Sequence, residues 1–339
     1  MTSSNSIKRG VSLYSFQEEY FLRKMSLEDI LAACDKLDIR GIEILGDQMI
    51  PNYPNISPAF FDQWHGWMGK YNLQPVCLDM FLDWNKFNGR IMTDDERLES
   101  IKKDIVNANK LGCTVIRVIH DVNTGILERA AETAEKNNVI LALEIHAPSY
   151  YDSPFEQELL KLYQRMNTPY LGFTLDMGVY CKKVPRVAIE RLKRDGMKNE
   201  IADYLEQGYN NGTLPTSHEL GVVNEELPAI IRKMGGTEED VMGAFMATHM
   251  IYGDPAILKD YIPYTYHVHG KFYEMLPDYT EYSIPYEEII PILQKGGFKG
   301  YIDSEYEGNR WIQDAYDVDS VEQVRRQHVM LKRLLGEEK

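Results

Sequence analysis

Short apolar segments alternate with amphipathic ones along most of this sequence, and this alternation constrains the fold more than any other feature. The apolar segments are rich in Val, Ile and Leu, which is typical of strands that are buried on both faces. Several of them end in a charged side chain. We expect eight such strands, at residues 10–16, 41–45, 75–81, 115–120, 139–146, 171–178, 266–272 and 300–307.

The segments between these strands place apolar residues three or four positions apart, as helices packed on one face do. Residues 93–111 are an example, because Thr93 and Glu96 also form a capping box at the expected start of the helix. We expect helices at residues 26–37, 58–71, 93–111, 126–136, 155–166, 184–205, 224–233, 237–249 and 318–335.

Eight strands that alternate with helices close into a parallel barrel more naturally than into an open sheet. A doubly wound sheet is the alternative. That fold would require a glycine-rich phosphate-binding turn after its first strand, and residues 15–20 contain no glycine. We therefore predict an α/β protein with one TIM (β/α)8 barrel domain over residues 1–339. About eighty residues separate strands six and seven, more than a crossover needs. We predict that residues 179–262 form a helical insertion over the barrel mouth.

Composition narrows the class of protein and its partners. The formal net charge of -15 argues against a nucleic-acid or anionic-membrane surface. Charged residues make up 26% and hydrophobic ones 44%, which is the balance of a globular protein with a sizeable core. No apolar run reaches the roughly 18 residues of a membrane span. The four cysteines are isolated in sequence, so we expect reduced thiols and a cytoplasmic protein: Cys34, Cys77, Cys113 and Cys181.

Acidic and basic side chains gather at the carboxyl ends of the last four predicted strands, where barrel enzymes place their active groups. Glu144 and His146 lie one pleat apart in I-L-A-L-E-I-H-A-P and point to the same side of their strand. The other strand ends supply Asp176, His267, His269, Lys271, Glu305 and Glu307.

Three of these carboxylates cannot converge while ionised unless a cation neutralises them. Together with one imidazole they form an oxygen-rich ligand set, which suits Mn²⁺, with Mg²⁺ or Co²⁺ as alternatives, better than structural Zn²⁺. The predicted metal ligands are Glu144, Asp176, His269 and Glu305.

Several of these side chains also have non-catalytic interpretations. A single carboxylate at a strand end could cap the next helix, and His146 could only orient Glu144. His267 lies deeper on its strand and is better explained as a core or supporting group. Asp79, His120 and Glu307 could be hydrogen-bonded groups at the rim, and Tyr14 and Trp84 could stack on a sugar or aglycone ring.

The motifs E-I-H, H-G-K and I-D-S-E-Y-E resemble those of the xylose isomerase-like barrels, a superfamily of sugar isomerases, ketose 3-epimerases and inositol-catabolism enzymes. The resemblance covers nearly the whole barrel and implies metal-binding roles for Glu144, Asp176, His269 and Glu305. The family often continues H-x-K-D, whereas this chain has Phe272, so the role of that Asp does not carry over.

The length, the E-I-H pair and the long segment after strand six also resemble the catalytic subunits of bacterial C-glycoside deglycosidases. The resemblance implies a manganese-dependent carbon–carbon lyase that cleaves 3-oxo-glycosides by elimination, together with a smaller second subunit in a hetero-oligomer. His146 would then remove the C2 proton, and Lys271 would hold a substrate hydroxyl or stabilise enolate charge. In a sugar isomerase or ketose 3-epimerase, the alternative, Glu144 and Glu305 would act on opposite faces of the carbon.

Two further classes fit a barrel of this kind. One is a carbohydrate-binding barrel that has lost turnover, which chelation would separate from the enzyme. The other is a metal-dependent endonuclease of the same superfamily, which the acidic net charge disfavours.

Overall fold

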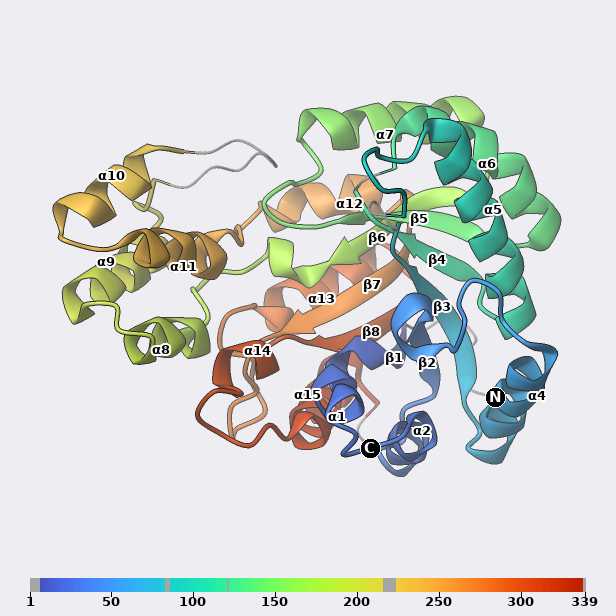
Figure 1. Cartoon of the computed structure of the whole chain (residues 1–339), viewed down its shortest axis with the longest axis horizontal. Helices are drawn as coiled ribbons and strands as arrows, with labels where there is room; N and C mark the ends of the chain where they lie inside the picture. The colour runs from blue at the N-terminus through green and yellow to red at the C-terminus, as the bar shows by residue number, and fades with distance from the viewer. Residues whose placement is uncertain (1–6, 83–85, 121, 216–223, 338–339) are drawn as a thin grey trace.

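The computed structural model describes residues 7–82, 86–120, 122–215 and 224–337. Eight parallel strands follow one another around a closed barrel, and β1 pairs with β8 to complete it (Figure 1). The predicted TIM barrel is confirmed. The strands are β1 Lys8–Ser12, β2 Gly41–Leu45, β3 Gln74–Met80, β4 Val115–Val118, β5 Ile140–Ile145, β6 Leu171–Asp176, β7 Thr265–Phe272 and β8 Tyr301–Tyr306.

Most of the helices surround the strands, and their apolar faces join one large core with the outward-facing strand residues (Figure 1). In chain order the helices are α1 Gln17–Phe21, α2 Leu27–Lys36, α3 Gly46–Met49, α4 Pro58–Lys70, α5 Asp94–Leu111, α6 Thr124–Asn137, α7 Pro154–Met166, α8 Arg186–Arg194, α9 Asn199–Asn210, α10 Glu226–Lys233, α11 Glu238–Thr248, α12 Leu258–Tyr261, α13 Tyr286–Lys295, α14 Asn309–Ile312 and α15 Ser320–Leu335.

Side-chain caps explain why several helices begin where they do. The hydroxyl of Thr93 accepts a hydrogen bond from the backbone N–H of Glu96, and the Glu96 carboxylate accepts one from the Thr93 N–H. The same reciprocal arrangement starts α2 at Ser26 and α11 at Thr237. Each box satisfies backbone donors that the first turn of a helix leaves free.

Several local features differ from the prediction. The first strand ends at Ser12 rather than at residue 16, because a 3-10 turn, Leu13–Phe16, follows it. The single helix expected at 184–205 is divided into α8 and α9, and Gly196 between them has a φ of 104°, a conformation that favours glycine. Helix α13 was not predicted, and it contains Pro291.

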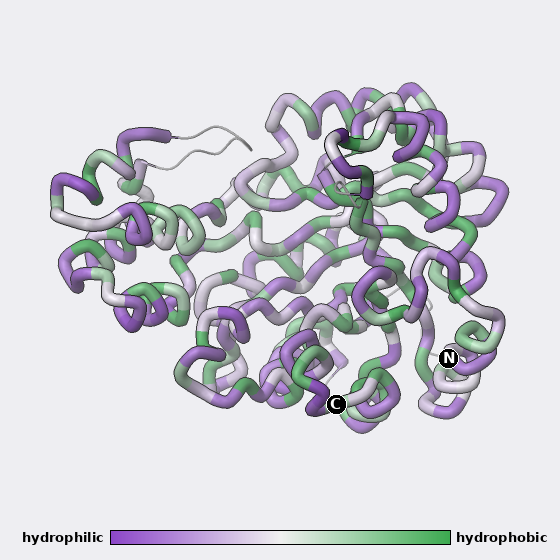
Figure 2. The backbone as a smooth tube through the Cα atoms, viewed as in Figure 1, coloured by the Kyte–Doolittle hydropathy of each residue, from purple (hydrophilic) through white to green (hydrophobic). Residues whose placement is uncertain are grey.

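Helices α8 to α11 lie between β6 and β7 and form a lobe at the left of Figure 1. Apolar and polar stretches alternate along them (Figure 2), and their apolar residues pack into a second core that includes Leu192, Ile201, Leu205 and Ile231. The predicted bounds of an insertion, 179–262, and its place over the barrel mouth stay predictions.

Among the residues that the structure describes, no helix combines the length and the apolar character needed to cross a membrane.

Candidate metal centre and catalytic chamber

Strands β5, β7 and β8 bring the side chains of Glu144, His269 and Glu305 together inside the barrel. Nδ1 of His269 lies 2.7 Å from Oε1 of Glu144 and 3.5 Å from Oε2 of Glu305. One ligand atom from each residue lies within 4.8 Å of the other two, and all three residues are buried. This triad can hold a metal ion.

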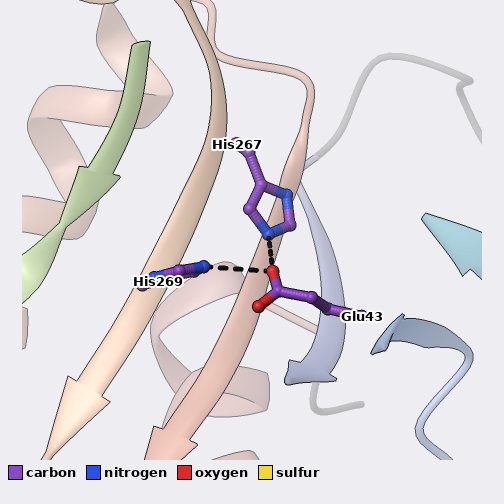
Figure 3. Close-up of side chains that lie close together, drawn as sticks. All are labelled: Glu43, His267 and His269. Atoms are coloured by element: carbon purple, nitrogen blue, oxygen red, sulfur yellow. Dashed lines mark hydrogen bonds and ion pairs between the residues drawn. The ribbon is translucent and has the colours of Figure 1, made fainter. Parts of the chain in front are cut away.

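The hydrogen bonds of His269 test whether a cation fits there. Its Nε2 lies 3.0 Å from Oε2 of Glu43, as Figure 3 shows. Although burial opposes ionisation, His269 and His267 hold the pKa of Glu43 well below its usual value, so this carboxylate only accepts and Nε2 carries the proton.

In the neutral ring Nδ1 then has a lone pair, yet it faces the carboxyl groups of Glu144 and Glu305, whose ionised forms only accept. Either a second proton or a cation between these atoms resolves the conflict. The donor set therefore fits a divalent ion.

The charges around His269 also favour a cation at this site. Burial lowers the pKa of His269, but Glu43, Glu305 and Glu144 outweigh it and raise the pKa well above its usual value. A buried imidazole under this influence lies in a strongly negative potential. Such a potential attracts a cation.

The two glutamates of the triad have different protonation tendencies. Burial raises the pKa of Glu305 to about 7, with Lys271 and His269 offsetting part of the rise. Burial also disfavours ionised Glu144, but Arg117 and His269 reverse the effect and hold its pKa well below the usual value. Unequal environments of this kind often separate the roles of paired carboxylates.

Lys271 connects Asp176 with the triad, because its ammonium group lies close to both Asp176 and Glu305. Nζ of Lys271 lies 2.7 Å from Oδ2 of Asp176, 3.3 Å from Oε2 of Glu305 and 3.4 Å from Oε1 of Glu307. The second oxygen of Asp176 accepts a hydrogen bond of 2.6 Å from the Gly178 N–H. The ligand role of Asp176 stays a prediction.

His146 is the accessible member of this cluster, because 32% of its side chain is exposed while that of Asp176 is fully buried. Its Nδ1 lies 2.6 Å from the carbonyl oxygen of Ala147, which only accepts, so Nδ1 carries the proton. Nε2 therefore has a lone pair, and it lies 3.3 Å from Nζ of Lys271. This tautomer leaves Nε2 able to take a proton.

Sequence reasoning missed the buried charges that support the triad. Glu43 on β2 accepts hydrogen bonds from His269 and, at 2.7 Å, from His267. Arg117 on β4 pairs with Asp79 and lies 3.8 Å from Glu144. A charged residue in the middle of an otherwise apolar strand, as in G-I-E-I-L and V-I-R-V, is the signal that could have found Glu43 and Arg117.

The remaining candidates line the mouth or support its walls. His267 is buried and contacts Glu43 and Asp303, and the supporting role expected for it stays a prediction. His120 lies 3.7 Å from Glu156. Trp84 lies outside the described residues. A cavity of about 300 Å³, here called the catalytic chamber, is lined by Tyr14, Phe81, Arg117, Ile119, His120, Glu144, His146, Ala147, Lys271, Glu305 and Glu307.

The comparisons with known proteins agree with the fold. Residues 31–180 match the family model described as xylose isomerase-like TIM barrel. The chain folds as a TIM barrel, and the resemblance to the xylose isomerase-like barrels predicted from the sequence is confirmed.

Two relatives with curated names are similar to this chain over nearly its whole length. The chain is 28% identical to the "3'-dehydrocarminate deglycosidase alpha subunit" of Microbacterium sp., over 99% of this chain and 98% of the relative. It is also 28% identical to the "C-glycoside deglycosidase alpha subunit" of Microbacterium trichothecenolyticum, over 95% of this chain and 90% of the relative.

A solved D-psicose 3-epimerase, determined in the presence of D-fructose, shares the fold with a TM-score of 0.57 and 12% identity, over 97% of this chain and all of that one. These relatives and neighbours are enzymes.

Proposed function

We propose that this protein is the catalytic subunit of a C-glycoside deglycosidase, a metal-dependent lyase that cleaves the carbon–carbon bond between a 3-oxo sugar and its aglycone. The match to alpha subunits of that name over nearly the whole chain supports this function. The observation that carries it is the position of His146, whose side chain is partly exposed and whose Nε2 faces Lys271 and Asp176 beside the acidic triad.

Glu144, His269 and Glu305 would hold the divalent ion, and we include Asp176 in the ligand set once Lys271 releases it. Mn²⁺ is our first choice because the set is rich in oxygen, with Mg²⁺ or Co²⁺ as alternatives. When bound, the ion would polarise the ketone and so make the hydrogen on the adjacent carbon more acidic.

The residues of the chain perform the proton transfers. Nε2 of His146 takes the proton from C2 of the sugar, and the electron pair forms a C1=C2 double bond. The bond from C1 to the aglycone breaks, its electron pair stays on the aglycone carbon, and that carbon gains one proton. One proton leaves and one returns, so the step consumes no oxidant or reductant.

Lys271 is placed to stabilise the charge that this step creates. Its ammonium is buried and lies 3.3 Å from both Nε2 of His146 and Oε2 of Glu305. Burial disfavours the charged form, but Asp176, Glu305 and Glu307 outweigh this effect and raise the pKa of Lys271 well above its usual value. Lys271 therefore remains charged while it donates to a substrate oxygen.

The relatives are named alpha subunits, which supports a smaller second subunit as the partner of this chain. We also propose a cytoplasmic location, because all four cysteines are free.

A ketose 3-epimerase is the second candidate. The observation that favours it is the approach of Glu144 and Glu305 to the same ring nitrogen, at 2.7 and 3.5 Å, since two carboxylates around one centre can exchange a proton across a carbon. In that enzyme His146 would not be the base.

The test is incubation of the full chain with Mn²⁺, with and without a coexpressed smaller subunit, on a 3-oxo-C-glycoside and separately on a free ketose. We expect release of the aglycone, and loss of this activity when a chelator removes the metal. Epimerised ketose with intact glycoside would support the second candidate. Bound Mn²⁺ without change in either compound would contradict both.

A further inference from the structure

A second group of buried side chains with metal-binding atoms adjoins the triad inside the barrel. Nε2 of His267 and Nε2 of His269 point at the same carboxylate oxygen of Glu43, over 2.7 and 3.0 Å (Figure 3). One ligand atom from each of these residues lies within 4.8 Å of the other two, and all three residues are buried. Glu43, His267 and His269, here called the inner site, are therefore close enough to share one ion.

The inner site differs from the triad in its chemistry. It offers two imidazoles and one carboxylate, whereas the triad offers one imidazole and two carboxylates. Zn²⁺ prefers nitrogen and sulfur ligands, while Mn²⁺ suits oxygen ligands. The ring of His269 contributes Nε2 to the inner site and Nδ1 to the triad. The two edges of one ring therefore face ligand sets that suit different ions.

Asp303 on β8 provides a further ligand beside the inner site. It is fully buried, and its Oδ2 lies 3.5 Å from Nε2 of His267, which is longer than a normal hydrogen bond. Among the residues that the structure describes, neither side-chain oxygen of Asp303 has a hydrogen-bond partner. Burial of such a carboxylate is costly without a cation. Gly10 makes room for it, because a Cβ there would lie 2.0 Å from Oδ1 of Asp303.

The spacing of the inner site is close to what Zn²⁺ requires. A tetrahedral Zn²⁺ with bonds of about 2.0–2.1 Å holds its ligand atoms about 3.3 Å apart. The oxygen of Glu43 lies 2.7 and 3.0 Å from the two nitrogens, so these atoms need to separate by only a few tenths of an ångström. Metal binding displaces the proton of a ligating nitrogen, so Zn²⁺ would replace the proton on Nε2 of His269.

We propose that Glu43, His267 and His269 form a second metal site that favours Zn²⁺, with Asp303 as its fourth ligand. When Zn²⁺ occupies Nε2 of His269, the proton of that ring is on Nδ1, 2.7 Å from Oε1 of Glu144, to which it donates. Nδ1 then has no lone pair for an ion in the triad. The inner site and the triad are therefore filled alternately, and Zn²⁺ in the inner site prevents His269 from ligating the triad ion.

Two ions and two variants of the full chain test this assignment, with dissociation constants for Zn²⁺ and Mn²⁺ measured by calorimetry. His267→Gln keeps an N–H donor for Glu43 but removes a ligating imidazole. It should weaken Zn²⁺ binding by roughly 10-fold or more and Mn²⁺ binding by less. Glu305→Gln should have the reverse effect, because Glu305 belongs to the triad alone. If Glu305→Gln weakens both ions and His267→Gln weakens neither, the chain has one metal site and the inference is wrong.

Two further substitutions test the fourth ligand and the specificity of the effect. Asp303→Asn should weaken Zn²⁺ binding, and unchanged affinity in a variant with native far-UV circular dichroism would remove Asp303 from the inner site. His65→Gln is the matched control for His267→Gln, because His65 is exposed and lies outside both sites. It should leave the affinity unchanged. Equal effects of the two histidine substitutions would mean that Zn²⁺ binds at the surface.

Crystals grown with Zn²⁺ test the location directly through anomalous scattering. We expect a peak about 2.0–2.1 Å from Nε2 of both His267 and His269. A peak only beside Nδ1 of His269 would overturn the inference. Native mass spectrometry of the chain with both ions should show one ion per chain, and two ions bound at once would contradict alternate filling.

These experiments do not depend on the reaction that the chain catalyses. If Zn²⁺ binds the inner site but no 3-oxo-C-glycoside is cleaved with Mn²⁺, the inner site stands and the proposed deglycosidase activity is wrong. If the glycoside is cleaved but Zn²⁺ does not bind the inner site, the activity stands and the second metal site is wrong.

Discussion

Nε2 of His269 donates a hydrogen bond of 3.0 Å to Glu43 (Figure 3), while Nδ1 of the same ring faces Glu144 and Glu305. This bond fixes the tautomer and presents Nδ1 to Glu144 and Glu305, where we propose that the metal binds. Partners of this kind typically change metal affinity 10- to 100-fold when they are removed.

We therefore expect Glu43→Leu to raise the Mn²⁺ dissociation constant by roughly 10- to 100-fold, measured by calorimetry. Glu43→Gln should lose less affinity, because the amide oxygen can still accept from Nε2. Glu19→Gln is the matched control, since Glu19 is also buried but bonds to Ser320. Unchanged affinity in a folded Glu43→Leu variant would contradict this role.

His146→Ala should leave metal binding nearly intact and lower turnover by roughly 10² or more, because it removes the proposed base without removing a ligand. Calorimetry and a product assay measure the two effects separately. Glu305→Gln should instead weaken metal binding. Turnover that survives in His146→Ala would exclude His146 from the mechanism.

Lys271→Met should destabilise the metal-free protein by roughly 3–5 kcal/mol, because it leaves buried Asp176 and Glu305 without their shared cation. Urea unfolding measures the loss. Lys70→Met removes an exposed partner of Glu28 and should shift the unfolding midpoint little. Similar shifts in the two variants would show that the Lys271 network does not stabilise the fold.

Acid should destabilise the protein through His328, a buried residue of α15 that is not a member of the triad. Burial, assisted by Arg9 and Lys332, lowers the pKa of His328 from 6.5 to about 3. The unfolded chain therefore binds a proton as the pH falls below about 6.5 while the folded chain does not until about 3, so this contribution to stability is complete above 6.5 and is lost on acidification.

His328→Gln removes the titrating group and can preserve its two hydrogen bonds, which are 2.8 Å to Arg9 and 2.9 Å to Ser304. Between these two pKa values the free energy of unfolding of the original protein should fall by up to about 1.4 kcal/mol per pH unit more than that of the variant. Parallel pH curves, from urea unfolding at each pH, would contradict this assignment.

The barrel could be predicted because each strand is an apolar run with helical periodicity on either side, and such signals are local. Helix α13 could not be predicted in the same way, since Pro291 interrupts its pattern and normally ends a helix.

The triad could be predicted from strand ends, but its supports could not. Glu43 reaches His269 across the barrel, and the register of β2 on β3 shifts between Ile42 and Glu43. A shift of one residue changes which face a side chain occupies. The sequence shows the charge on β2 but not the partner that it meets.

A cavity of about 80 Å³ adjoins the catalytic chamber at His146 and Glu307, and its outer wall belongs in part to a separately packed unit. Ala247 on α11 lies in the core shared by α8 to α11, and Trp311 packs against the same core. Substitutions in that wall can therefore be absorbed within the lobe, while the strands that carry the triad stay fixed. Divergence in this wall among related chains can then reshape the cavity without displacing Glu144, His269 and Glu305.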